Sequence, residues 1–305
     1  MRKSQIGKPK FQILIFLLLM FYSCGEKPKV SNPKFSITDD LEVEVSFDSL
    51  PKRIISLAPN ITETLFAIGA DSQIVGVTDF CDYPPEAKLK TKTGSYISPD
   101  YETISSLDPD LIIINVENVS NPNYQALKNL GMKLFVSKAG NVDEIFKMIK
   151  DFGTITGKYR GSDTLYARLK NEGAALRSEV KHDSLNYLIL ISISPLMTTN
   201  GKTFINDILK LAGVNNMYSD QSIDYPEVSY EDVLSRDPDY IIFPADTSDT
   251  EKTMKFTNEI RRQLNDTKAV KDNKIIVTDA NTMFRPGPRI FDAVRRLKSK
   301  VNRVF

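Results

Sequence analysis

One segment of the chain occurs twice, at residues 96–113 and again at residues 225–242. The copies share a tyrosine, a Tyr-Glu pair, a serine, an Asp-Pro-Asp turn and an Ile-Ile pair at identical spacing. Each copy predicts a short helix around its glutamate, a turn, and then a buried apolar strand. A repeat separated by this much sequence is typical of two equivalent lobes rather than of a solenoid. We therefore expect an α/β chain built around a pseudo-twofold axis, with its function located between the lobes.

The N-terminus has the composition of an export signal. Basic residues precede an apolar run from Phe11 to Tyr22, in which only Gln12 is polar, and Cys24 follows. The run is too short to cross about 30 Å of hydrocarbon as a helix, which predicts a signal peptide over residues 1–23. The cysteine at the cleavage point resembles that of a bacterial lipoprotein signal, which implies that Cys24 carries lipid and anchors the chain to a membrane, facing the periplasm or the cell exterior. The alternative is a chance cysteine in an ordinary signal peptide.

Charge and cysteine content argue against nucleic-acid binding and against a stabilising disulfide. The chain has 40 basic and 39 acidic residues, and removal of residues 1–23 takes four basic ones, which leaves 36 against 39, a balance near −3. A slightly acidic chain without a dense basic face is not suited to a nucleic-acid backbone. If Cys24 carries lipid, Cys81 has no disulfide partner, so the hydrophobic core must hold the fold. We interpret Cys81 as a small buried packing residue rather than as a cobalt or haem ligand.

Composition divides the mature chain into four parts. Residues 24–34 are polar and contain prolines, which predicts a flexible tether. Residues 35–140 begin with a small hairpin and then alternate strands with helices, as a mainly parallel sheet requires. Residues 141–184 contain two amphipathic helices, the second over 161–181, and residues 185–305 repeat the α/β scheme. Because a helix of that length reaches about 30 Å, we expect it to be a single backbone helix that joins two lobes, with the ligand cleft between them and little hinge closure.

The periodicity also places the individual elements. Strands are expected at 53–57, 74–77, 111–115 and 133–137 in the first lobe, and at 187–193, 240–244 and 274–279 in the second. Helices are expected at 61–69, 101–107, 123–130, 142–156, 203–212, 230–235, 253–264 and 289–304. Asn60 followed by Glu63 forms a capping-box variant for the first helix, and Gly69 predicts the end of that helix.

Several segments, in this order, resemble the helical-backbone substrate-binding proteins of ABC importers. They are Arg53 to Glu63, Val75 to Ala87, the two Asp-Pro-Asp segments, and Arg285 to Arg289. The stretch 75–87 is most similar to the cobalamin-binding branch, and the resemblance runs from about residue 36 to the C-terminus. It implies two α/β lobes joined by a long helix, a ligand cleft between them, and a chain that works as a monomer. Its partner would be an ABC permease dimer with nucleotide-binding subunits.

Glu102 and Glu231 occupy equivalent positions in the two copies of the repeat. In the family, one glutamate on each lobe pairs with arginines of the dimeric permease, and the resemblance implies this role for both residues. Acids related by a pseudo-twofold can meet arginines related by a true twofold, which fixes the register of the complex and steers encounter. The alternative is that each glutamate is only a favourable acid in the first turn of its helix.

The resemblance also implies a set of ligand contacts on the cleft loops. Large rings can stack on a large flat ligand without freezing many torsions. As equivalent residues of the repeat, Tyr96 and Tyr225 would present rings from opposite walls, although such aromatics can also be half-buried loop anchors. Arg285 would serve a ligand amide or phosphate, or close a salt bridge inside its lobe. The full set comprises three aromatic residues and four others, namely Phe80, Tyr96, Tyr225, Met197, Asn281, Met283 and Arg285.

A corrinoid is the ligand that the resemblance to the cobalamin-binding branch implies, and we expect no separate cofactor. Metal capture by an imidazole cluster is excluded because His182 is the only histidine. A ferric-siderophore or haem binder of the same family is the alternative, with Tyr96 or Tyr225 recruited toward the iron. A secreted hydrolase is disfavoured, since the sequence has neither a Gly-x-Ser-x-Gly elbow nor a phosphate-binding glycine loop. We therefore expect a binding protein and not an enzyme.

Overall fold

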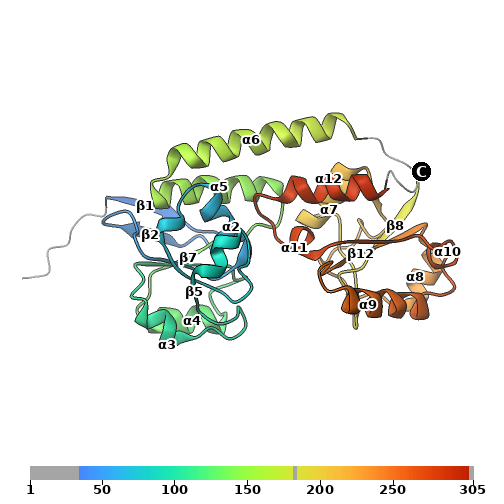
Figure 1. Ribbon diagram of the computed structural model, residues 1–305, viewed down its shortest axis with the longest axis horizontal. Helices are drawn as coiled ribbons and strands as arrows, with labels where there is room; N and C mark the ends of the chain where they lie inside the picture. Colours follow the sequence, from blue (N-terminus) through green and yellow to red (C-terminus); the bar gives the residue numbers. More distant parts are fainter. Residues whose placement is uncertain (1–33, 181–183, 302–305) are drawn as a thin grey trace, which may run out of the picture.

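The computed structural model describes residues 34–180 and 184–301. The signal peptide, Cys24, nearly all of the tether and His182 lie outside the described residues. The described chain forms two α/β lobes, and α6 (Tyr159–Ser178) runs along both of them (Figure 1). The predicted fold class is confirmed. Within the described residues, no helix combines the length and the apolar character that a membrane span needs.

The N-terminal lobe is built on a parallel sheet with strand order β5-β4-β3-β6-β7. Its short β5 was not predicted because two residues show no periodicity. A separate antiparallel hairpin pairs β1 (Phe35–Thr38) with β2 (Glu44–Phe47), as expected. The sheet strands are β3 (Ile54–Ser56), β4 (Ile74–Val77), β5 (Thr91–Lys92), β6 (Leu111–Ile114) and β7 (Leu134–Val136). The helices are α2 (Pro59–Ala67), α3 (Tyr101–Ser106) and α4 (Pro122–Asn129), with short 3-10 turns at Asp71–Gln73 and Pro85–Leu89.

The predicted capping box at the start of α2 is wrong. The helix begins at Pro59, Ala58 precedes it without a side-chain cap, and both Asn60 and Glu63 are buried. Proline at the first helical position has no N–H that would need a cap. The predicted end is confirmed, because α2 stops at Ala67 and Gly69 follows with φ +80.

The C-terminal lobe has a four-stranded parallel sheet in the order β11-β8-β12-β13. The predicted strand 187–193 is instead two strands, because residues 192–197 fold back into an antiparallel hairpin. The strands are β8 (Asn186–Ile189), β9 (Ser192–Ile193), β10 (Leu196–Met197), β11 (Asn215–Asn216), β12 (Tyr240–Ala245) and β13 (Ile275–Asp279). The helices are α7 (Phe204–Ala212), α8 (Tyr230–Arg236), α9 (Thr250–Gln263), α10 (Lys268–Lys271), α11 (Ala280–Met283) and α12 (Ile290–Val301).

The sequence repeat corresponds to a structural repeat. In each lobe the helix of the repeat leads into the strand that pairs in parallel with the first strand of that sheet, so β6 lies beside β3 and β12 beside β8. Reading across the sheets, β4-β3-β6-β7 matches β11-β8-β12-β13. The prediction of a short helix, a turn and a buried strand is confirmed in both copies.

The Asp-Pro-Asp segments are structural. Asp108 and Asp237 both have φ 43, a left-handed conformation that turns the chain out of the preceding helix. The second aspartate then accepts backbone N–H groups at the start of the neighbouring strand. Asp110 accepts from Lys52 and Arg53 at 2.8 and 3.0 Å, and Asp239 accepts from Asn186 at 2.9 Å. Turn formation and strand anchoring therefore account for these carboxylates without catalysis.

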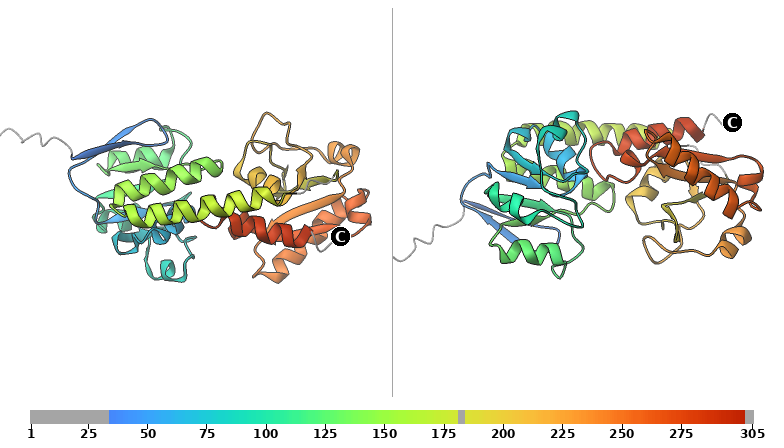
Figure 2. Two further views of the ribbon diagram at one scale, coloured as in Figure 1. Left: turned by 90° about the horizontal axis from the view of Figure 1, so that it is seen from above. Right: turned by 60° about the horizontal axis from the view of Figure 1, so that its bottom comes forward.

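Two packed helices link the lobes. Helix α5 (Val142–Thr156) is capped by the Asn141 side chain, which accepts from Glu144 N, and it ends at Gly157 in a left-handed conformation. It lies against α6 so closely that a Cβ on Gly153 would come within 2.4 Å of Ser162 Cβ, so only glycine fits there. The left panel of Figure 2 shows α6 crossing from one lobe to the other, with α12 beside its far end. The linkage is helical rather than extended, as predicted.

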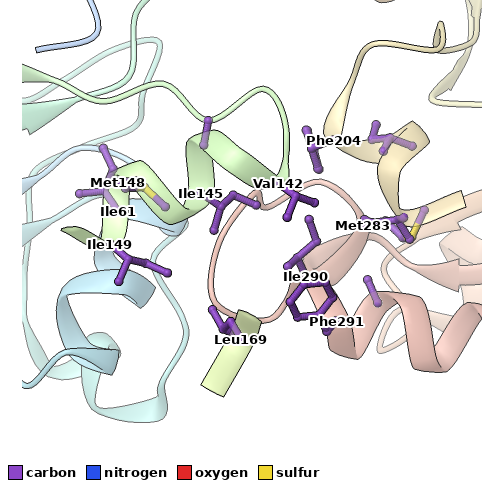
Figure 3. Close-up of a cluster of buried hydrophobic side chains, with 14 of the residues drawn as sticks. Ile61, Val142, Ile145, Met148, Ile149, Leu169, Phe204, Met283, Ile290 and Phe291 are labelled. Carbon is purple, nitrogen blue, oxygen red and sulfur yellow. The ribbon is translucent and has the colours of Figure 1, made fainter. Parts of the chain in front are cut away.

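The two lobes share one hydrophobic core. Buried side chains from helices of both lobes meet between the sheets and α6 in a single cluster (Figure 3). On α6, a Cβ at Gly173 would lie 2.7 Å from the Phe291 ring, so glycine there allows α12 to pack closely. Separation of the lobes would expose this apolar surface to water, at a free-energy cost of about 25 cal/mol for each Å² exposed. The shared core therefore supports the expectation of little hinge closure. Labelled members of the cluster are Ile61, Val142, Ile145, Met148, Ile149, Leu169, Phe204, Met283, Ile290 and Phe291.

Candidate functional site

A cavity of about 420 Å³ lies between the lobes. On the N-terminal side it is formed where β6 and β7 end, which is the edge of a parallel sheet at which ligands generally bind. On the C-terminal side it is formed by the loops that precede α7, α8 and α12. We call it the interlobe cavity. It is lined by Asn115, Glu117, Lys138, Ala139, Gly140, Asn141, Glu144, Lys202, Thr203, Phe204, Asp224, Tyr225, Phe284 and Pro286.

Tyr225 is the predicted aromatic contact that lines the interlobe cavity. Its side chain belongs to the C-terminal lobe but lies close enough to Glu117 of the other lobe for that negative charge to raise its pKa. Burial, with smaller contributions from Asp224 and Glu117, raises the pKa of Tyr225 to about 12. The phenol therefore stays protonated at neutral pH and presents an uncharged ring to the cavity.

Tyr96 and Phe80 stand on exposed loops of the N-terminal lobe and are not among the residues that line the cavity. Tyr96 is 42 % exposed, and its carbonyl accepts a hydrogen bond from Asn123 Nδ2 at 2.8 Å. Phe80 is 60 % exposed in the turn that follows β4. Both rings are therefore accessible, while the predicted pairing of Tyr96 with Tyr225 across one cavity is not seen in its lining.

Three other predicted contacts occupy different environments. Met197 is partly buried in β10, and its backbone forms an isolated antiparallel β-bridge with Glu227. Asn281 accepts a hydrogen bond from Arg285 at 2.7 Å. Met283 is 1 % exposed within the core shared by the lobes, as Figure 3 shows, which argues against a ligand contact there. The short helix α11 turns this side chain inward.

Arg285 forms salt bridges across the lobes rather than inside its own lobe. Its Nη1 donates to Glu63 Oε1 at 3.3 Å and to Asp82 Oδ1 at 2.5 Å. Arg289 pairs with the same Glu63 through two hydrogen bonds of 2.8 and 2.5 Å. We call these four residues the interlobe ionic seam. Burial acts to raise the pKa of Asp82, but the hydrogen bond and charge of Arg285 outweigh it and hold that pKa below its usual value.

The cavity contains charged residues that the sequence analysis missed. They include Glu117, Lys138, Lys202 and Asp224. Glu117 closely follows the buried strand at 111–114, and Lys138 closely follows the one that ends at Val136. Polar residues just beyond the carboxyl end of a parallel strand were therefore an available signal for two of them. Lys202 and Asp224 come from loops with no comparable pattern.

Glu102 and Glu231 have equivalent surroundings on the two lobes. Each is exposed in the first turn of its helix, α3 or α8. Neither forms an ion pair with any other residue of the described ranges, and both helices lie on the side of the molecule away from α6 (Figure 1). The two carboxylates are therefore accessible to a partner on that side.

The tyrosine before each glutamate ties its helix to the next one in the lobe. Tyr101 donates to Asn123 Oδ1 of α4 at 2.8 Å, and Tyr230 donates to Gln263 Oε1 of α9. The repeat therefore preserves the anchoring of both helices as well as the acids. In residues 34–180 and 184–301, no His, Cys, Asp and Glu side chains gather in threes or more as a metal ion would require.

Two curated relatives are similar to this chain along most of its length. An uncharacterized ABC transporter substrate-binding lipoprotein, YvrC of Bacillus subtilis, is 28 % identical, and the alignment covers 94 % of this chain and 95 % of YvrC. A vitamin B12-binding protein of Pectobacterium carotovorum is 29 % identical, with 83 % of this chain and 89 % of the relative covered.

Two solved structures have the same fold. The periplasmic vitamin B12 binding protein BtuF of Vibrio cholerae gives a TM-score of 0.70 at 26 % identity, covering 83 % of this chain and 97 % of BtuF. The apo form of the periplasmic heme-binding protein RhuT from Roseiflexus sp. RS-1 gives a TM-score of 0.70 at 25 % identity, covering 82 % and 97 %. The family model for periplasmic binding protein matches residues 54–282, which is most of the chain. This protein therefore belongs to the periplasmic binding protein family, whose members bind solutes and are not enzymes.

Proposed function

We propose that this chain is the lipid-anchored, monomeric substrate-binding protein of an ABC importer. In this proposal it captures cobalamin or a related corrinoid between its lobes and delivers it to a permease dimer, whose nucleotide-binding subunits spend the ATP. Membership of the family and the similarity to YvrC support the transport role and the anchor at Cys24. The B12-binding relatives support the corrinoid.

The charge balance of the interlobe cavity is the observation that carries the corrinoid assignment. Two lysines face three acids there, Glu117, Glu144 and Asp224. Arg285 adds no free positive charge, since it already pairs with Glu63 and Asp82. Anionic ferric siderophores and the propionates of haem favour a net positive site, because like charges repel. The amide groups at the edge of a corrin are uncharged and need both donors and acceptors, which such a cavity supplies.

The ring of Tyr225 supports the same assignment. An uncharged aromatic surface stacks on a flat macrocycle, whereas an axial tyrosine ligand to ferric haem must first lose its proton. A pKa near 12 makes that loss more costly than for an ordinary tyrosine. The similarity to RhuT is the observation on the side of the haem alternative. Like haem, an anionic ferric siderophore would require a net positive site.

Titration of the purified protein tests this proposal. Cyanocobalamin, dicyano-cobinamide, haem and a ferric siderophore would be added separately, and binding would be followed by calorimetry and absorbance. We expect saturable binding of one corrinoid per chain and no saturation with the iron compounds. Saturation with haem or the siderophore and none with either corrinoid would overturn the assignment while leaving the transport class intact.

Replacement of Tyr225 by alanine should weaken cyanocobalamin binding by about tenfold, because the ring supplies stacking surface inside the cavity. Tyr225→Phe keeps the ring and should bind nearly as well as the wild type. Titration calorimetry measures both, with thermal melting to confirm that each variant is folded. Tyr159→Ala, which removes a 57 % exposed ring at the start of α6, is the matched control. Equal affinities for Tyr225→Ala and the wild type would place the ligand elsewhere.

A further inference from the structure

Arg285 joins predicted ligand segments of the two lobes, and Arg289 contacts the neighbouring Tyr83 ring and the Asn281 carbonyl. The Arg285 guanidinium donates to Asp82 at 2.5 Å and to Asn281 Oδ1 at 2.7 Å, and it makes a longer contact of 3.4 Å with the Phe80 carbonyl. Phe80 and Asp82 belong to the turn after β4, and Asn281 belongs to α11, the short helix that directly follows β13. Because the donors of a guanidinium are fixed in one plane, these bonds set the position of the turn relative to α11.

Pairing of the buried Glu63 does not depend on Arg285. Glu63 is buried, with 2 % of its side chain exposed, and it accepts two hydrogen bonds from Arg289. Arg285 reaches Glu63 with only one longer contact, of 3.3 Å. Asp82 is 43 % exposed and can be solvated. Loss of Arg285 would therefore leave Glu63 paired. The contacts to the turn that Arg285 alone supplies are those to Asp82 and to the Phe80 carbonyl.

Its own lobe holds the turn at Cys81 and at the residue before Phe80, Asp79, whose N–H donates to Gly94 O at 3.0 Å. Cys81 is buried at 1 % exposure, its N–H bonds to Thr78 O, and its carbonyl accepts from Lys92 Nζ at 3.0 Å. On either side of Cys81, the Phe80 carbonyl and the Asp82 carboxylate are held by Arg285 from the other lobe. The exposed Phe80 ring is therefore oriented jointly by both lobes.

We propose that Arg285 is a positioning residue for ligand recognition, which fixes the Phe80 turn of one lobe against α11 of the other. This inference rests on the proposed function, since it assigns the 80–82 turn to the binding site for the corrinoid. Arg285 acts through Phe80 and need not touch the ligand. Both lobes thereby position one contact surface, next to the core that they share.

A double-mutant cycle tests the ligand side of this inference. The variants are Arg285→Met, Phe80→Ala and the pair combined, each titrated with cyanocobalamin. Arg285→Met should weaken binding by about tenfold in the wild-type background and by less than about twofold when Phe80 is already alanine. Arg295→Met, which removes an arginine paired with Glu172 and Asp292, should leave the affinity unchanged. Additive losses, or no loss for Arg285→Met, would overturn the proposal.

Hydrogen exchange of the ligand-free protein tests the positioning role of Arg285 independently of whether the protein binds a corrinoid. Arg285→Met should speed exchange of the Cys81 amide by several-fold, while amides in β6 exchange as in the wild type. Unchanged exchange in the turn would overturn the positioning role even if corrinoid binds. Faster exchange in a protein that binds no corrinoid would instead uphold the positioning and refute the ligand assignment.

Discussion

Replacement of Arg289 by methionine is expected to lower the free energy of unfolding by about 3–5 kcal/mol. Glu63 is almost fully buried, and Arg289 supplies its two shorter hydrogen bonds. Without Arg289 the carboxylate keeps only the 3.3 Å contact with Arg285, which also serves Asp82. A buried charge with insufficient compensation is costly. The Tyr83 ring, which lies 4.0 Å from the guanidinium carbon of Arg289, would lose its partner as well.

Urea denaturation and thermal melting measure this effect. For a chain of this size, we expect the melting temperature to fall by roughly 10 °C. Arg295→Met removes an exposed arginine with two salt bridges and should cost no more than about 1 kcal/mol. The double variant Glu63→Met with Arg289→Met should be more stable than Arg289→Met alone, since it removes the unpaired charge. Equal stabilities for Arg289→Met and Arg295→Met would show that the seam does not stabilise the fold.

Reversal of both docking charges, Glu102→Arg together with Glu231→Arg, should abolish corrinoid uptake while leaving corrinoid affinity unchanged. Both glutamates are exposed in the first turns of equivalent helices, away from the residues that line the interlobe cavity. If the permease presents arginines, two reversals replace two attractions by two repulsions, each costing several kcal/mol. Uptake of labelled cyanocobalamin by cells that carry the cognate permease measures transport, and titration of the purified variant measures binding.

A matched control reverses two acids on the opposite side of the molecule. Asp163 and Glu179 lie on α6 and just beyond its end, and their partners are the exposed Lys150 and the half-buried Lys298. Asp163→Arg together with Glu179→Arg should transport as the wild type does. Normal uptake by the Glu102 and Glu231 double variant would contradict the docking role and leave both glutamates as ordinary first-turn acids.

The architecture of the lobes could be predicted from the sequence because it depends on local pattern and on the repeat. Apolar residues at 111–114 and 240–243 alternate between the shared core and the outer face of each sheet in the same phase, as residues of one strand must. The Asp-Pro-Asp turns fix where each of these strands begins. Only very short elements, such as β5 and the β9-β10 hairpin, escaped prediction, since two residues show no period.

The interlobe seam could not be predicted, because no local rule pairs residues more than two hundred positions apart. Glu63 has the spacing of a helix cap, yet Pro59 begins the helix and the carboxylate is buried against arginines from the other lobe. Arg285 has the chemistry of a ligand contact, yet both of its terminal nitrogens already donate to the seam, the turn and Asn281. Met283 follows Asn281 on a predicted cleft loop, yet its side chain faces the core. Contacts between distant parts of the chain determine the environments of Glu63, Arg285 and Met283.

A crystal structure of the protein with cyanocobalamin tests the central claim most directly. The account predicts the corrin in the cleft between the lobes, with the Tyr225 ring within about 4 Å of the ligand, contacts from both lobes, and Glu102 and Glu231 still exposed. A ligand bound outside the cleft, or a ligand that leaves Tyr225 untouched, would contradict it.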